Sequence, residues 1–210
     1  MRFRHGAVRN KDQLGSNRMT SETLGLTAVD VKRLKEDPSP TNRTLTGLKV
    51  ASAFGDKLDD DERAIAEEIF RLMLRDAETR VRLALSESLK DNPNVPRDVA
   101  LGLARDVAEV ASPILQHSEI LTDDDLKEII NECSAAHAIA VAGRKHVSES
   151  VSEALADTAD EDAVAALVAN QGAELTERVL KKVVDSFGDV ETVSAPLAER
   201  DWLPISISER

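Results

Sequence analysis

The sequence repeats itself at a nearly constant interval. An apolar residue followed by a residue that commonly begins a helix recurs at spacings of 26, 26, 28 and 28 residues. The five pairs are Val95-Pro96, Leu121-Thr122, Val147-Ser148, Leu175-Thr176 and Leu203-Pro204. Proline suits the first helical turn because its missing N–H has no partner there, and threonine and serine accept hydrogen bonds from the free amides. A period of this length indicates one supersecondary unit per repeat.

Each unit is predicted to hold two short helices. After Leu121-Thr122, for example, apolar residues stand at Leu126, Ile129, Ile130 and Cys133, at spacings that place them on one helical face. A second set of helix starts lies between the first, and its acidic members are suited to cap free amides. This second set is Asp76, Asp106, Ser134, Asp160 and Asp189. We call the helix after a residue of the second set helix A and the helix after a pair of the first set helix B.

These helices are too short to bury their apolar stripes alone, so neighbouring units must stack. The sequence therefore predicts an all-α fold without a β-sheet: an alpha-solenoid of stacked antiparallel helix pairs, right-handed or nearly straight.

The segments that flank the repeats suggest three regions. Upstream, residues 26–36 and 41–54 are predicted to form short helices, and Asp59 begins an acidic run that caps a longer one. The apolar stripe of that longer helix is expected at Ile65, Ile69, Leu72 and Met73. We predict a basic arm at 1–20, helices that cap the stack at 21–75 and repeats at 76–210. Because the helix after Leu203-Pro204 has only one turn of sequence, we expect that a longer parent protein continued beyond it.

Composition narrows the class of protein. The 210 residues are 41% apolar and 31% charged, which is typical of a globular chain. Aromatic residues make up 2%, too few to supply stacking platforms for bases. Cys133 is the only cysteine, so an intrachain disulfide and a multi-cysteine metal site are excluded. No apolar run is long enough to cross a membrane, and we expect a cytoplasmic protein.

Charge is unevenly distributed along the chain. Residues 1–20 contain five basic side chains against Asp12 alone, a balance of +4, while the net charge of the whole chain is −12, which leaves −16 for the rest. A weak nucleic-acid or membrane contact is conceivable for this arm. The acidic body repels phosphate groups, so we expect neither nucleic acid nor a membrane as its partner.

Several segments resemble known families. Residues 76–84 resemble the HEAT-repeat pattern, in which Asp and Arg ladders connect adjacent repeats, and residues 89–97 resemble the turn of leucine-rich variant repeats. Residues 22–210 together are similar to an alphaproteobacterial family, domain of unknown function 2336. The segments that carry this likeness are 36–40, 66–71, 120–126, 137–140 with Arg144, and 170–173. The resemblance implies a HEAT-like fold and brings no established activity.

No constellation for catalysis stands out. The four histidines, His5, His117, His137 and His146, form no ligand set with the spacing of a known metal site, and we expect them to be exposed in turns. The acidic runs at 123–125 and 157–162 lack the glycine of a calcium loop and are expected to cap helices. No glycine-rich phosphate loop occurs. We therefore predict no catalytic, cofactor-binding or metal-binding residue, and we interpret Cys133 as a small core residue.

Polar residues recur in the turns between helix A and helix B. These are Asn92, Ser118, Arg144, Asn170 and Arg200. Two interpretations are open. They cap the carbonyls that end helix A and connect neighbouring turns, or they form a polar rim that orients a partner, with Arg144 clamping a carboxylate.

The predicted function is a non-enzymatic scaffold or adaptor that binds an extended peptide or helix, preferably basic, along a groove. The polar sides of the B helices are expected to line this groove. The candidate partner-binding residues are Arg97, Lys127, Arg144, Lys181 and Arg200. The alternative is a regulatory domain that binds a small anionic molecule in the groove beside Arg144. Self-association is also plausible around Trp202, because Leu203, Ile205 and Ile207 are expected to be exposed.

Overall fold

The computed structural model is all-helical and describes residues 32, 36–55, 57–158, 160–200 and 203–208. Over these residues no β-strand forms. The helices are α2 (Pro40–Ala53), α3 (Asp60–Leu74), α4 (Thr79–Leu89), α5 (Arg97–Ala104), α6 (Ala108–His117), α7 (Asp123–Glu132), α8 (Ala135–Ala142), α9 (Glu149–Asp157), α10 (Glu161–Ala169), α11 (Glu177–Phe187), α12 (Glu191–Ala198) and α13 (Ile205–Ser208). The predicted arm at 1–20 and most of the helix predicted at 26–36 lie outside the described residues.

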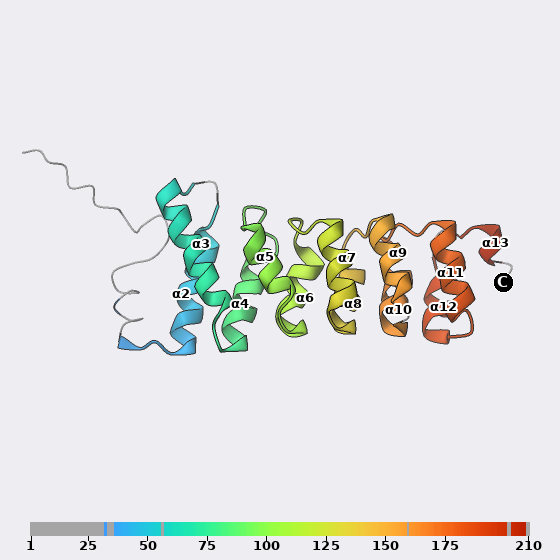
Figure 1. The fold of residues 1–210 in the computed structure, drawn as a ribbon, viewed down its shortest axis with the longest axis horizontal. Coiled ribbons are helices and arrows are strands. Elements are labelled where there is room, and N and C mark those ends of the chain that lie inside the picture. Colours follow the sequence, from blue (N-terminus) through green and yellow to red (C-terminus); the bar gives the residue numbers. More distant parts are fainter. Residues whose placement is uncertain (1–31, 33–35, 56, 159, 201–202, 209–210) are drawn as a thin grey trace, which may run out of the picture.

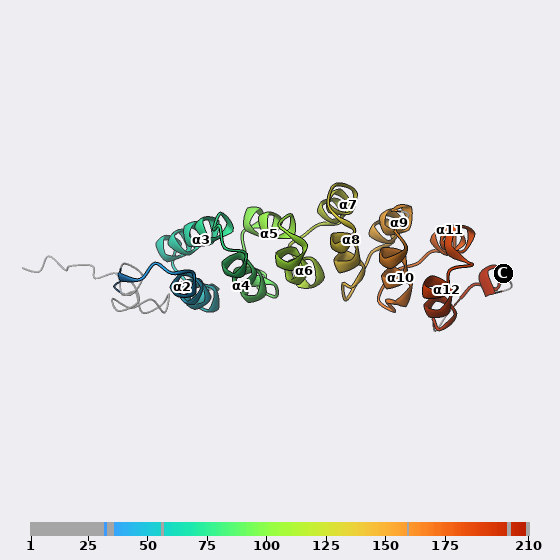
Figure 2. The same cartoon turned by 90° about the horizontal axis from the view of Figure 1, so that it is seen from below.

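The helices lie in two rows along one nearly straight axis (Figures 1 and 2). The even row contains α2, α4, α6, α8, α10 and α12, and each of these helices packs on the next. The odd row contains α3, α5, α7, α9, α11 and α13. Neighbouring helices of this row pack less closely than those of the even row, and α5 and α7 make the least contact with each other. The pair α2 and α3 already follows this arrangement, so the helices predicted to cap the stack within 21–75 continue the two rows.

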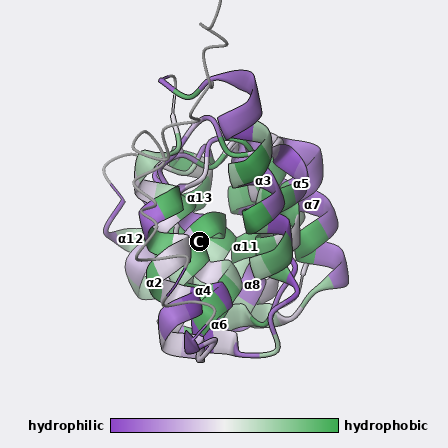
Figure 3. Cartoon of the chain, turned by 90° about the vertical axis from the view of Figure 1, so that its left-hand side faces the viewer, coloured by the Kyte–Doolittle hydropathy of each residue, from purple (hydrophilic) through white to green (hydrophobic). Residues whose placement is uncertain are grey.

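A single hydrophobic core runs between the rows. The view along the axis shows hydrophobic segments of the even and odd helices near the middle and hydrophilic segments mostly at the periphery (Figure 3). Small side chains allow the even row to pack closely: α8 reads AAHAIAVA, and Val141 and Ala142 are fully buried. Each helix is short, so its buried stripe is covered only because its neighbours are in place.

The predicted starts of the B helices are confirmed. Thr122, Ser148 and Thr176 are the N-cap residues of α7, α9 and α11, and each side chain accepts a hydrogen bond from the backbone three residues later. At α7 the cap is reciprocal, because the Asp125 carboxylate also accepts from the Thr122 N–H at 2.9 Å. Such caps satisfy amides that have no partner inside the helix.

The expected caps of the A helices are only partly confirmed. Asp160 caps α10 by accepting from the Ala163 N–H at 2.9 Å. Asp76 and Asp106 instead stand before the N-cap residues of α4 and α6. They receive bidentate hydrogen bonds from arginines in the preceding even-row helix, Arg43 to Asp76 and Arg82 to Asp106, with shortest distances of 2.6 Å. These carboxylates therefore join successive even-row helices.

The buried face of α3 matches the predicted stripe only in part. Met73 is buried and Ile69 is partly buried against the core, as predicted, whereas Ile65 and Leu72 are 45% and 60% exposed. Ala66 and Phe70 are buried instead. Phe70 packs edge-on against Phe54 with the ring centroids 5.0 Å apart, and this contact fixes the orientation of the helix. Two adjacent apolar stripes have the same period, so spacing alone could not decide between them.

Candidate functional site

The turns that follow the even-row helices form a connected polar edge, which we call the turn edge. It contains Asn92, Ser118, Arg144, Asn170 and Arg200. The Asn170 side-chain amide donates to the carbonyls of Ala142 and Arg144, both at 2.7 Å. Asn92 likewise donates to the carbonyl of Phe54 at 2.9 Å. The donors thus reach back to the carbonyls at the end of the preceding even-row helix or turn.

Both arginines of the turn edge are used in this way. Arg144 donates to the carbonyl of Leu115 and, at 2.8 Å, to that of Ser118. Arg200 donates to the carbonyls of Val168, Asn170 and Ala173 at 2.8–3.1 Å. Burial lowers the pKa of the Arg144 guanidinium, while the negative charges of Asp123 and Glu119 oppose that shift. An arginine keeps its charge under such conditions, and carbonyl oxygens stabilise it. This geometry matches the capping interpretation of the turn edge.

A backbone contact joins two successive turns of the same edge. The Val147 N–H donates to the Gly172 carbonyl at 3.3 Å, and the Val147 carbonyl accepts from the Glu174 N–H at 2.9 Å. Gly172 is needed here, because a β-carbon on it would lie 2.1 Å from the backbone oxygen of Lys145. The close approach of the two turns leaves no room for a side chain.

The other three candidate partner-binding residues lie apart from the turn edge, on the odd row. Arg97 begins α5 and forms an ion pair with Asp125 of α7. Lys127 forms an ion pair with Asp124 at 2.8 Å within α7. Lys181 is exposed on α11, and no ion pair or hydrogen bond is recorded for its ammonium group within the described part of the chain.

Two helices of the odd row, α7 and α9, carry net negative charge, and charged side chains bridge the row from one helix to the next. In α7 the sequence DDDLKEIINE has one lysine among its acidic residues, and in α9 every charged residue is a carboxylate. Several pairs cross from one odd-row helix to the next: Arg71–Asp98, Arg97–Asp125, Arg105–Glu128, Arg178–Glu153 and Lys182–Asp157. Hydrogen bonds from Ser148 and Ser150 lower the pKa of Asp123, which therefore stays ionised.

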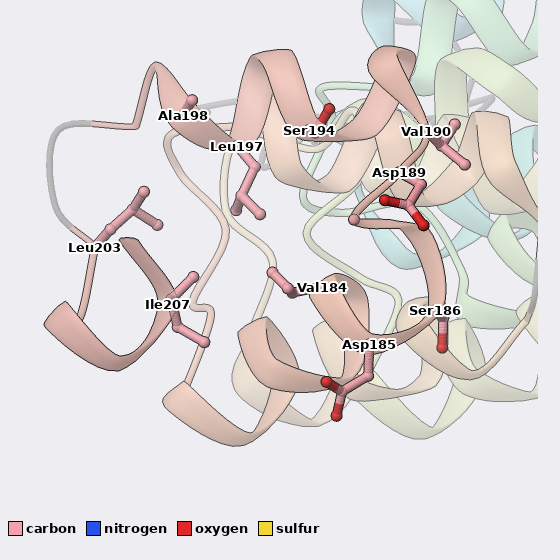
Figure 4. Close-up of a pocket in the computed structure, with 11 residues that line it drawn as sticks. Val184, Asp185, Ser186, Asp189, Val190, Ser194, Leu197, Ala198, Leu203 and Ile207 are labelled. Carbon is pink, nitrogen blue, oxygen red and sulfur yellow. The ribbon is translucent and has the colours of Figure 1, made fainter. Parts of the chain in front are cut away.

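A cleft of about 460 Å³ lies where α11, α12 and α13 meet (Figure 4). Four apolar side chains converge on it from three helices and the segment before α13: Val184, Leu197, Leu203 and Ile207. Asp185 and Asp189 lie at its rim with Ser186 and Ser194. We call this the end cleft. No single segment of the sequence predicts this cleft, since its walls come together only in the folded chain.

The end cleft corrects the exposure expected for the last apolar residues. Ile207 is buried and Leu203 is half-buried in its wall, whereas Ile205 is 75% exposed as expected. The predicted contact around Trp202 falls outside the described residues.

Of the histidines that the structure describes, His137 is placed differently from the prediction. His137 is buried rather than exposed, with its two ring nitrogens 2.8 Å from the Ser134 hydroxyl and the Asp106 carbonyl. This arrangement ties α8 to the turn before α6. His117 and His146 are exposed as predicted, and Cys133, at the end of α7, is partly buried and packs against the core, in line with its interpretation as a core residue. Across the described residues no group of three or more histidine, cysteine or acidic side chains could hold a metal ion.

The fold and the turn edge define an all-helical protein whose helix pairs are joined by backbone-directed polar side chains. Residues 110–210 match the family described as uncharacterised protein conserved in bacteria (DUF2336), and this match supports the assignment of that segment to the family. The matched segment begins within α6 and includes the end cleft. A search of curated proteins found no match to the chain, and neither did a search of solved structures. No helix in the described ranges has both the length and the apolar character of a membrane span.

Proposed function

We propose that the chain is an alpha-solenoid of HEAT-like repeats that acts as a cytoplasmic, non-enzymatic scaffold or adaptor. Its partner is a basic extended peptide or helix that binds along the odd row. The single observation that supports this most strongly is the acidic surface of α7 and α9. A row of short helices offers a long surface with recurring spacing, which suits an extended partner.

The arrangement of the charges favours a partner of this kind. Exposed carboxylates such as Asp124 and Glu149 recur in the first turns of odd-row helices. Several ion pairs that bridge the odd row are largely exposed, so cations of a partner can replace Arg105 or Arg178 with little loss. Association of this type is accelerated by long-range attraction and weakened by salt. Lys181, on the same row, is suited to contact an acidic residue of the partner.

The alternative, a domain that responds to a small anion beside Arg144, has less support. Such a site needs a guanidinium directed at a cavity. The Arg144 donors point at the carbonyls of Leu115 and Ser118, and the Arg200 donors also point at backbone carbonyls. We therefore assign Arg144 and Arg200 to holding the turns that keep the odd row in register.

The proposal is tested by affinity capture of partners with two charge-reversal variants. The test variant is Asp124→Lys with Glu149→Lys in the odd row, and its matched control is Glu109→Lys with Asp162→Lys in the even row. All four residues lie in the first turn of a helix, so both variants lose the same favourable interaction with a helix N-terminus.

We expect one basic partner to be retained by the unmodified chain and by the control, and to be lost from the test variant and at high salt. Equal recovery of every retained protein on both variants would contradict the proposal. Proteolysis of the partner–chain complex then maps the bound segment, which we expect to be rich in lysine and arginine.

A further inference from the structure

The helices are least firmly joined at one place along the molecule, which we call the seam. The seam separates α5 and the turn before it (residues 90–96) from α7 and the turn before it (residues 118–122). Among neighbouring odd-row helices, α5 and α7 make the least contact. Each packs instead on the even-row helix that follows it, and does so more closely than the other odd-row helices do. The two sides of the seam are therefore supported separately.

The turn edge is interrupted at the same place. Asn92 and Arg144 donate to carbonyls earlier in the chain. The residue between them, Ser118, instead accepts a hydrogen bond from the Ile120 N–H of its own turn at 3.3 Å. Within the described residues, no hydrogen bond joins the two turns that border the seam. A cleft of about 270 Å³ lies between them, lined by Asp91, Asn92, Pro93, His117 and Glu119.

Two arginines of α5 bridge the seam on the odd row, and we call them the clasp. Arg97 forms an ion pair with Asp125 of α7, and its side chain is 56% exposed. Arg105 forms an ion pair with Glu128 at 2.6 Å and is 42% exposed. Exposed pairs of this kind contribute little to stability and are screened by salt. Asp125 is buried, but it also accepts from the Thr122 N–H and hydroxyl, both at 2.9 Å, so its charge stays hydrogen-bonded without Arg97.

Each side of the seam is tied to its own neighbours. Arg71 of α3 donates two hydrogen bonds to the Asp98 carboxylate of α5. On the other side, the hydroxyls of Ser148 and Ser150 donate to Asp123 of α7. The even row continues past the seam, because α6 packs closely on both α4 and α8. The molecule is thus continuous along one row and weakly closed along the other.

We propose that the seam is a hinge, with Arg97 and Arg105 as the clasp that holds it closed. Opening moves α5 away from α7 and lengthens the odd row, while the even row keeps its packing and serves as the axis. The curvature of the molecule then changes at one place instead of evenly along its length. The hinge is a property of the chain alone, and it does not depend on the partner of the proposed function.

The proposal is tested by measuring distances between two spin labels with pulsed electron paramagnetic resonance. Cys133→Ala first removes the native thiol. The first label pair, Glu68→Cys with Lys181→Cys, uses exposed positions on α3 and α11, on opposite sides of the seam. The second pair, Asn131→Cys with Lys181→Cys, lies on one side of it. We expect high salt to lengthen the first distance by several ångström and to leave the second unchanged.

A variant without the clasp, Arg97→Gln with Arg105→Gln, should lengthen the first distance at low salt as well. The matched control is Arg178→Gln with Lys182→Gln, which removes two cations that bridge α9 and α11. Because these two helices also pack on each other, we expect its distances to equal those of the unmodified chain. Circular dichroism verifies that each variant keeps its helices.

Three results would overturn the proposal. The first is a distance across the seam that stays the same when the clasp is removed. The second is an equal lengthening in the matched control, which would mean that the odd row loosens everywhere when its ion pairs are lost. The third is an equal lengthening of the second label pair, which would place the movement outside the seam.

Discussion

The even and odd rows hold the same chain together by different means. In the even row, small buried residues let each helix pack closely on the next. The carboxylates of Asp76 and Asp106 also accept hydrogen bonds from arginines of the preceding even-row helix. In the odd row the helices stand farther apart, and exposed ion pairs such as Arg105–Glu128 span the space between them. Close apolar packing contributes far more stability than exposed ion pairs do. Both rows contribute buried side chains to the core, and we expect the closer packing of the even row to contribute the larger share of the stability.

The comparison is tested most strongly by removing one buried leucine from each row. Leu167 of α10 and Leu155 of α9 are both fully buried. We expect Leu167→Ala to lower the free energy of unfolding by about 4 kcal/mol and Leu155→Ala by about 2–3 kcal/mol, because widely spaced helices relax around a cavity more easily. Urea unfolding followed by circular dichroism measures both. A larger loss for Leu155→Ala would contradict the larger share of stability assigned to the even row.

The turn edge is expected to come next in effect. Arg144→Ala leaves the carbonyls of Leu115 and Ser118 without their donor, and we expect a loss of about 2 kcal/mol. Arg144→Lys should recover only part of this, because one ammonium group cannot reproduce the planar geometry of a guanidinium. The same urea titration measures both variants. Unchanged stability of Arg144→Ala, together with loss of a bound partner, would return Arg144 to the role of a binding residue.

The close approach of two turns gives a third prediction. Gly172→Ala places a β-carbon against the Lys145 carbonyl, and backbone must move to make room. We expect a loss of about 1–2 kcal/mol. Gly55→Ala is the control, because an added β-carbon there meets no atom within 4 Å. The melting temperature of Gly172→Ala, measured by thermal unfolding, should therefore be clearly lower than that of Gly55→Ala. Similar melting temperatures would show that the two turns can move apart.

The Arg–Asp hydrogen bonds between even-row helices predict that the stability of the fold depends on pH. The hydrogen bond from Arg43 is the main cause that lowers the pKa of Asp76 below its ordinary value. A carboxylate whose pKa is lower in the folded state stabilises the fold above its unfolded pKa of about 3.9, and this contribution is lost as the pH falls through the lower, folded value. We expect Asp76→Asn to be less stable than the unmodified chain at neutral pH and to approach it in acid. A stability difference that stays constant across this range would contradict this role of Asp76.

The smallest effect is expected in the odd row. The Arg178–Glu153 and Lys182–Asp157 pairs are exposed on at least one side. Arg178→Gln with Lys182→Gln should change the free energy of unfolding by less than about 1 kcal/mol. Chemical unfolding at low and high salt checks this. A large loss at low salt would show that the ion pairs, rather than the even row, hold the helices in place.

Much of the helical pattern could be predicted from the sequence because its signals are local. Thr122, Ser148 and Thr176 act on amides three residues away, so their spacing from the apolar stripe was enough to place α7, α9 and α11. The two stripes of α3 were ambiguous for the opposite reason. The contact that selects Ala66 and Phe70 comes from Phe54, which belongs to the end of another helix.

The candidate site was harder to predict because its partners are distant in sequence. The carbonyls that accept hydrogen bonds from Arg144 belong to Leu115 and Ser118. The Asp106 carbonyl that is hydrogen-bonded to His137 is 31 residues away in the sequence. The recurrence of polar residues in the turns could be seen in the sequence. Their acceptors could not be predicted, because they are backbone carbonyls, which every residue carries. The end cleft depends on α11, α12 and α13 coming together, which no single segment of sequence encodes.

The turn edge also gives the molecule a direction. Asn92, Arg144, Asn170 and Arg200 all donate toward residues earlier in the chain. The carbonyls of a turn that is synthesised first are therefore bound by water until the next unit has been synthesised and folds over it. Removing units from the carboxyl side takes these side-chain donors away from the newly exposed turn, whereas removing units from the amino side leaves the donors without their carbonyl acceptors, and water replaces the missing partner in both cases. The order of synthesis and the order of structural dependence thus run in opposite directions along one chain.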